Sequence, residues 1–245
     1  MKANFLLLCA ALLASSCQKN EHPTPTPGAE DPDWVKLRIP TPWDGDEAYS
    51  VIGDLDKTLL VATTERLSAT SDQGKTWRTL KVFSRPTYGL LLRNDTLFAL
   101  SARATTPQGQ SVATVADQFS TDFGQTWAYP VDANYYRLRA ISQPFGQVGA
   151  VGISYEIREN AVPISGQANS TALLATDLLR TDAAGQVQTL RLPARHYLKN
   201  LALDAQHRLY VTASGLRFDD RTGTVYDPAK SEKSAVVYVS RRPLP

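Results

Sequence analysis

The chain has 245 residues with 26 Lys or Arg and 24 Asp or Glu, which leaves a formal net charge of +2. Such a balanced charge provides no basic surface for nucleic acid, so we expect that the protein does not bind nucleic acid. The two cysteines, Cys9 and Cys17, both lie near the N-terminus. The remaining chain therefore has no thiol for a disulfide, a thiolate metal site or a nucleophile. We expect no metal and no cofactor.

Residues 1–16 have the composition of a secretory signal. Lys2 precedes an apolar run from Phe5 to Leu13, and small residues lead up to Cys17. This run is too short to span a bilayer as a mature helix. The stretch resembles a bacterial lipobox, although Ala14 stands where leucine is more typical. The resemblance implies cleavage before Cys17, acylation of Cys17 and a lipid-anchored place in the cell envelope, with the outer membrane as the expected membrane and its periplasmic or surface face left open. An ordinary secreted protein is the alternative.

The segment 17–33 is predicted to be an acylated cysteine followed by a tether. Residues 18–33 contain no aliphatic side chain larger than that of Ala29, and Pro alternates with Thr in them. This composition favours an extended, solvated spacer over a packed element. The folded domain is then 34–245, which is long enough for one well-buried domain.

The domain is predicted to be all-β. No convincing helical period extends over eleven or more residues, and short alternating apolar runs are separated by Gly, Pro, Asn and Asp. The runs fall into four units. The first two are Tyr49–Asp54, Thr58–Thr64, Arg66–Ser71 and Thr76–Phe83, then Tyr88–Arg93, Thr96–Arg103, Val112–Thr121 and Thr126–Val131. The last two are Tyr136–Ser142, Gln147–Tyr155, Thr171–Thr181 and Val187–Pro193, then Tyr197–Asp204, Arg208–Phe218 and Ser234–Ser240.

The fourth unit lacks its last strand, and the missing strand is expected at the other end of the domain. Trp34–Pro40 resembles the outer strands that begin at Trp77 and Trp127. A ring of sheets avoids an unpaired seam when its first and last segments share one blade. We therefore predict a small β-propeller of about four four-stranded blades, closed by Trp34–Pro40. A degenerate five-bladed ring and an open array completed by a partner are the alternatives.

Two eight-residue stretches share the pattern [Ser/Thr]-x-Asp-x-Gly-x-Thr-Trp. Their defining residues are Thr70, Asp72, Gly74, Thr76 and Trp77 in the first, and Ser120, Asp122, Gly124, Thr126 and Trp127 in the second. An Asp, Ser or Thr heading a turn can accept bonds from backbone N–H groups just after it, and Gly tolerates the crowded backbone. The pattern resembles the Asp-box of BNR-repeat, sialidase-like β-propellers. That resemblance implies a structural role for these residues, with a worn third copy at Asp182–Gly185.

The candidate binding surface is the rim opposite these turns. It would carry the insertions Ala104–Ser111, Glu156–Ser170 and Arg217–Lys233, because exposed loops on a rigid scaffold often bear function. Four tyrosines stand just before the inner strands, where fourfold symmetry would place them around the channel mouth. The proposed binding residues are Tyr49, Tyr88, Tyr136, Tyr197, Arg137, Arg195 and Trp43. Packing between blades is the alternative role for the tyrosines.

Catalytic residues are not identified. The resemblance to sialidases implies an arginine triad, a tyrosine activated by a glutamate and an acidic proton donor. Arg38-Ile39-Pro40 matches one sialidase motif, but Arg38 falls on a predicted outer strand, far from the channel. The expected function is a non-catalytic envelope lipoprotein that binds a partner protein or a glycan at its rim. A sialidase-like exo-glycosidase and an assembly factor for a membrane complex are the alternatives.

Overall fold

The computed structural model describes residues 31–43, 45–130, 137–138, 140–150, 152–164, 166, 170–223 and 231–244. Within these ranges the regular structure is β, apart from a helical turn at 137–138. No helix in the described part of the chain is long and apolar enough to cross a membrane. The lipobox, Cys17 and nearly all of the tether lie outside the described residues.

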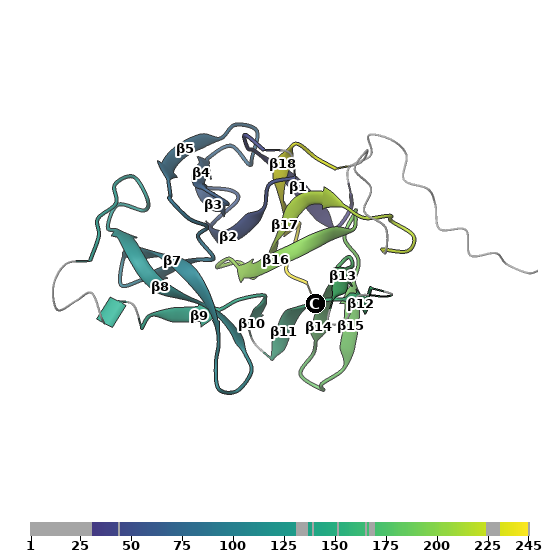
Figure 1. Cartoon of the computed structure of the whole chain (residues 1–245). Coiled ribbons are helices and arrows are strands. Elements are labelled where there is room, and N and C mark those ends of the chain that lie inside the picture. The colour runs from purple at the N-terminus through teal and green to yellow at the C-terminus, as the bar shows by residue number, and fades with distance from the viewer. Residues whose placement is uncertain are drawn as a thin grey trace, which may run out of the picture. The chain divides into compact units, whose positions relative to one another are not determined.

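Four antiparallel four-stranded sheets form the blades (Figure 1). Blade 1 consists of β2 (Ala48–Gly53), β3 (Leu59–Thr63), β4 (Arg66–Thr70) and β5 (Arg78–Val82). Blade 2 consists of β6 (Gly89–Arg93), β7 (Thr96–Thr105), β8 (Ser111–Ser120) and β9 (Ser142–Pro144). Blade 3 consists of β10 (Gln147–Ala150), β11 (Ile153–Arg158), β14 (Asp177–Thr181) and β15 (Val187–Leu190). Blade 4 consists of β16 (His196–Leu203), β17 (Leu209–Arg217), β18 (Ser234–Ser240) and β1 (Trp34–Pro40). The predicted fold class, a small four-bladed β-propeller, is confirmed.

The closing strand lies where the sequence predicts it. β1 pairs antiparallel with β18 over its whole length, from Trp34 opposite Ser240 to Pro40 opposite Ser234. Leu37 and Ile39 alternate to a buried face of this strand and pack with β2 and β3 of blade 1. The N-terminal strand therefore completes blade 4 and also contributes to the seam with blade 1.

Each seam between neighbouring blades contains its own apolar cluster. Ile39 and Val51 belong to the cluster between blades 4 and 1, and Tyr155 and Tyr238 to the one between blades 3 and 4. Phe83 packs in the cluster between blades 1 and 2. Phe145 lies just before β10 and packs with β7 residues in the cluster between blades 2 and 3. The domain is thus stabilised by apolar burial distributed around the ring.

Blade 3 differs from the strand prediction. Gln147–Tyr155, expected as one strand, is the hairpin β10–β11, and β10 is the inner strand of the blade. Gly152 has a φ of 75°, a conformation that glycine adopts without strain and that supports a tight reversal between Ala150 and Ile153. The expected inner strand Tyr136–Ser142 is therefore wrong. In its described part only Ser142 is in a strand, and that strand is β9, which pairs with β8.

Two further strand predictions need correction. Thr171–Thr181 is split, because Thr171–Leu173 (β13) pairs with Ala161–Pro163 (β12) as a separate hairpin within the rim insertion. The segment Thr126–Val131 was expected as the outer strand of blade 2. In its described part, 126–130, it makes an isolated bridge between Ala128 and Phe119 and no regular strand. β9 occupies the remaining edge of β8 instead, so the outer edge of blade 2 is shared by two segments.

Both Asp-containing turns connect the third strand of a blade to its outer segment, and they share the bonds from the Gly amide to the Ser or Thr hydroxyl and from the Thr amide and hydroxyl to the Asp carboxylate. In the second turn, Asp122 Oδ1 accepts from Thr126 N at 2.8 Å and Gln125 N at 2.9 Å. Thr126 Oγ1 donates to Asp122 Oδ2 at 2.6 Å, and Gly124 N donates to Ser120 Oγ at 2.7 Å. Trp127 Nε1 donates to Gly124 O. The side chains thus replace ladder bonds that the turn cannot make.

Candidate functional site

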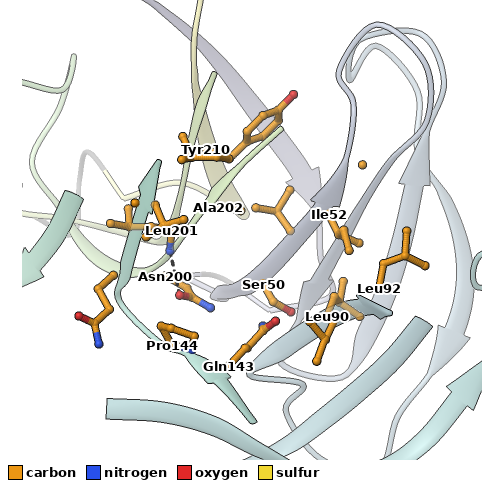
Figure 2. A pocket seen from close by; sticks show the side chains of 17 residues that line it. Ser50, Ile52, Leu90, Leu92, Gln143, Pro144, Asn200, Leu201, Ala202 and Tyr210 are labelled. Carbon is orange, nitrogen blue, oxygen red and sulfur yellow. Dashed lines mark hydrogen bonds between the residues drawn. The ribbon is translucent and has the colours of Figure 1, made fainter. Parts of the chain in front are cut away.

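A central cavity of about 390 Å³ is lined by the four inner strands β2, β6, β10 and β16, together with residues of β9 and β17. Its lining is mostly aliphatic, with Ser50, Gln143 and Asn200 among the polar exceptions, and Tyr210 contributes to the wall opposite Gln143 in the view of Figure 2. Asn200 connects several blades. Its Oδ1 accepts from Gly146 N at 2.8 Å, and its Nδ2 donates to Tyr88 O at 3.1 Å.

Aromatic rings from the four blades gather beyond the Ser50–Asn200 end of this cavity, which we call the channel mouth. Tyr49 and Tyr88 meet edge to face with centroids 5.0 Å apart, and Tyr88 meets Phe145 in the same way at 6.0 Å. Lys199 Nζ lies 4.2 Å from the Tyr197 ring centroid and 5.6 Å from that of Tyr49. The rings and the ammonium group therefore form one continuous cluster across blades 4, 1, 2 and 3.

The polar groups of the channel mouth are largely paired within it. Glu47 forms an ion pair with Lys199 at 2.6 Å and accepts a hydrogen bond from Tyr49 Oη. Tyr197 Oη donates to Glu159 Oε1 at 3.2 Å. Because these groups satisfy one another, the exposed parts of the rings are the main interaction surface that remains.

The protonation of the mouth follows from burial and from the carboxylates. Burial, with the hydrogen bond to Glu47, raises the pKa of Tyr49 far above its ordinary value. Burial and the nearby Glu159 raise the pKa of Tyr197 to about 12. Burial lowers the pKa of Lys199, although its ion pair with Glu47 acts in the opposite direction. Both tyrosines are therefore protonated at neutral pH and are poor nucleophiles as they stand.

The structure brings together three of the residues proposed for binding, namely Tyr49, Tyr88 and Tyr197. Tyr136 lies outside the described residues, and Arg137 is exposed in the helical turn at 137–138. Arg195 is held away from the rings, because its Nε donates to Asp220 O at 3.0 Å. Trp43 is exposed on the connection from β1 to β2, and no ring contact to the channel mouth is found for it among the described residues.

Five residues of the channel mouth were not among the sequence-based binding candidates, namely Phe145, Arg103, Lys199, Glu47 and Glu159. Phe145 contributes a ring next to Tyr88, and Arg103 lies over the Phe145 ring at 4.3 Å. Phe145 was missed because the inner strand of blade 3 was assigned too early in the chain. Lys199 had a readable signal, since it follows Tyr197 by two residues and successive residues alternate along a strand.

At the opposite end of the cavity an ionic cluster has a structural role. The Arg208 guanidinium contacts Asp54, Asp56 and Asp204 at 2.7–2.8 Å. It joins the β2–β3 turn of blade 1 to the β16–β17 turn of blade 4. In the part of the chain that the structure describes, no group of three His, Cys, Asp or Glu side chains is arranged to hold a metal ion.

The fold and this channel define the chain as a β-propeller. No protein-family model matches the sequence, and no curated protein matches it. Among solved structures it is similar to a luciferin-regenerating enzyme, with 12% identity over 84% of this chain and 95% of that one and a TM-score of 0.41. It is also similar to a streptogramin B lyase (7% identity, 84% and 97% coverage, TM-score 0.31) and to virginiamycin B lyase from Staphylococcus aureus (9%, 84% and 98%, 0.32). Likeness at this level gives no argument about activity.

Proposed function

We propose that the chain is a non-catalytic, lipid-anchored protein of the bacterial cell envelope that binds a partner protein at the channel mouth. The observation that supports this most is the cluster of Tyr49, Tyr88, Phe145 and Tyr197, brought together from four blades. Aromatic and cationic groups of this kind are enriched at sites where one protein anchors a side chain of another.

The internal pairing of the mouth favours a partner side chain over a sugar. A sugar requires hydrogen-bonding groups that are still available, whereas Glu47, Lys199 and Tyr49 already bind one another. An apolar or aromatic side chain needs only ring faces and edges, together with partial exclusion of water. We therefore favour a partner segment that places such a side chain against Tyr49 and Tyr197.

The envelope assignment depends on the sequence features of residues 1–33. The lipobox-like stretch before Cys17 and the Pro/Thr-rich tether are typical of a domain held away from a membrane surface. The two Asp-containing turns, with their resemblance to Asp-boxes, contribute stability to blades 1 and 2 in this proposal. A role in assembling a membrane complex is one form of it, with that complex as the partner.

Site-specific photo-crosslinking in the native bacterium tests the proposal. A photo-reactive phenylalanine derivative is introduced at Tyr197, and in a matched control at Val187, which is exposed on outer strand β15. We expect a discrete crosslinked partner from position 197 only, and its loss when Tyr49→Ala is added in the same chain. Palmitate labelling that disappears in Cys17→Ser is expected alongside it. Equal crosslinks from both positions, or none from position 197, would contradict partner binding at the mouth.

A sialidase-like glycosidase is the second candidate, and one observation favours it. Tyr49 Oη donates to Glu47, which is the tyrosine–glutamate pairing expected of that class. Against it, Glu47 is already engaged in an ion pair with Lys199, and burial raises the pKa of Tyr49 rather than lowering it. Arg38 lies on outer strand β1 and binds Glu232 at 2.7 Å, away from the channel mouth. Turnover of a fluorogenic sialoside that is abolished by Tyr49→Phe would establish this candidate over the first.

A further inference from the structure

A second pocket, with a more polar lining than the central cavity, lies apart from the channel mouth. It is on the face of blade 2 that packs against blade 1. It has a volume of about 280 Å³. Its walls come from the β5–β6 connection, from β7 and β8, and from the segment after Trp127. The residues that carry the argument are Arg85, Ser101, Asp117, Gln118 and Tyr129.

A β-bulge in β8 creates this pocket. Ala99 pairs with Gln118 and Leu100 with Ala116, so Asp117 is an extra residue without a partner on β7. In a regular strand Asp117 and Gln118 would point to opposite faces of the sheet. The extra residue removes that alternation, and both side chains line the same pocket. Bulges of this kind re-aim side chains and occur preferentially next to functional sites.

The backbone beside the bulge is strained. Val115 has a φ of 65°, which is rare for any side chain and most unfavourable for a β-branched one. Such a conformation costs free energy and persists only where its surroundings enforce it. Ser101, on the facing strand, donates its Oγ–H to Asp117 Oδ2 and lies 3.4 Å from Val115 O.

Gln118 supplies an acceptor that is buried and unused. The residue is only 7% exposed, and its Oε1 has no hydrogen-bond partner among the described residues. An unpaired buried acceptor is costly, and a ligand hydroxyl would remove that cost. Asp117 adds a second acceptor, and the Arg85 guanidinium, 3.7 Å from that carboxylate, adds exposed donors and balances its charge.

We propose that this pocket binds a single sugar unit of a neutral saccharide. Vicinal hydroxyls both donate and accept, which suits the acceptors of Asp117 and Gln118 and the donors of Arg85. Tyr129 lines the pocket and is 65% exposed, so its ring is available to the apolar face of a pyranose. The volume of the pocket lies just below that of drug-sized pockets, so it has room for one sugar ring but not for several rings of an oligosaccharide. This proposal does not rest on partner binding at the channel mouth.

Saturation-transfer NMR with the full-length protein tests the proposal. The probes are the methyl glycosides of glucose, galactose, mannose and N-acetylglucosamine, each titrated separately. We expect saturation transfer to at least one glycoside. We expect Asp117→Asn and Tyr129→Ala each to weaken that binding by about tenfold or more. The first variant removes a charged hydrogen-bond acceptor, and the second removes the ring on which the sugar stacks.

Two controls separate this site from the channel mouth and from misfolding. Tyr197→Ala, at the mouth, is expected to leave glycoside binding unchanged, and Tyr129→Ala, on an exposed side chain, is expected to leave thermal unfolding unchanged. Absence of transfer to every glycoside would overturn the proposal. So would transfer that survives both Asp117→Asn and Tyr129→Ala, or that is lost only in Tyr197→Ala.

Discussion

At the scale of single residues, Asp122 shows how one carboxylate can organise a turn. It accepts from the backbone N–H groups of Gln125 and Thr126 and from the Thr126 hydroxyl. The Thr126 hydroxyl and amide, with Ser120, hold the pKa of Asp122 at about 2, well below its ordinary value. The carboxylate is therefore the form on which the turn depends.

Replacing this carboxylate should lower stability without affecting either proposed binding site. We expect Asp122→Ala to lower the melting temperature by a few degrees, on the order of 3 °C, because two amides and the hydroxyls of Thr126 and Ser120 lose their acceptor. Asp182→Ala is the matched control. In the part of the chain that the structure describes, the Asp182 carboxylate accepts from Ala184 N and Gln186 N and from no hydroxyl, so the effect of its replacement should be smaller. Differential scanning calorimetry measures both variants. A loss of partner or glycoside binding in Asp122→Ala without a loss of stability would show that the turn has a functional role.

At the scale of secondary-structure elements, β1 is the strand that closes the ring of blades. It pairs with the edge of β18 and buries Leu37 and Ile39 in the seam between blades 4 and 1. An unpaired β18 would leave a buried, apolar strand with an open edge, which is a template for aggregation. The ring therefore depends on a segment that is far from β18 in sequence.

Truncation of the apolar face of β1 should destabilise the whole domain. Ile39 is fully buried, so we expect Ile39→Ala to reduce the free energy of unfolding by about 2–5 kcal/mol. Thr79→Ala on β5 is the control, since it changes an exposed side chain of another outer strand and should have little effect. Urea unfolding followed by tryptophan fluorescence gives both values. Equal stabilities for the two variants would mean that β1 does not hold the ring together.

The same scale shows what the sequence could predict and what it could not. β16 and β18 were predicted to within a few residues, because alternating apolar residues and flanking turn residues define them locally. β1 was predicted because it resembles the segments that begin at Trp77 and Trp127. Blade 3 was predicted less well. Gln147–Tyr155 was expected as one strand, and the reversal at Gly152 became evident only from the pairing of β10 with β11.

The candidate sites were predictable to an even smaller extent. Tyr49, Tyr88 and Tyr197, at the start of the inner strands of blades 1, 2 and 4, were visible in the sequence because those three units repeat the position. Phe145 depends on the correct inner strand of blade 3. The bulge that aims Asp117 depends on the register between β7 and β8, which is set by long-range pairing and not by residues 115–118 alone.

At the scale of the whole molecule, pH dependence can be assigned to one buried group over a defined range. His196 is only 1% exposed, and its Nδ1 lies 2.8 Å from Ser214 O, to which it donates. Burial, reinforced by the nearby Lys36, lowers the pKa of His196 to about 4. Glu232 and Asp177 also matter, but at lower pH. Burial acts to raise their pKa values, while the bonds from Lys36 to Glu232 and from Arg158 to Asp177 outweigh it and lower them.

The sign of the effect follows from which state binds more protons. The histidine has a pKa near 6.5 in the unfolded chain and about 4 in the folded domain, so below pH 6.5 the unfolded state takes up the proton. Stability contributed by neutral His196 is complete above pH 6.5 and is lost as pH falls toward 4, by an amount on the order of 3 kcal/mol. The lowered carboxyl pKa values of Glu232 and Asp177 add a further loss only as the pH falls below the ordinary range of carboxyl groups.

Urea unfolding between pH 7 and 5 therefore isolates the histidine, because carboxyl groups of ordinary pKa stay mostly ionised in the unfolded chain over this range. We expect the wild-type free energy of unfolding to decline through this window and the decline to be much shallower in His196→Gln. His207→Gln is the control, because His207 is exposed in the β16–β17 turn and should leave the slope unchanged. A wild-type slope retained in His196→Gln would assign the acid sensitivity to other groups. Because His196 lies in the strand that joins blade 4 to blades 1 and 3, its protonation would loosen the ring at the strand that also carries Tyr197 and Lys199.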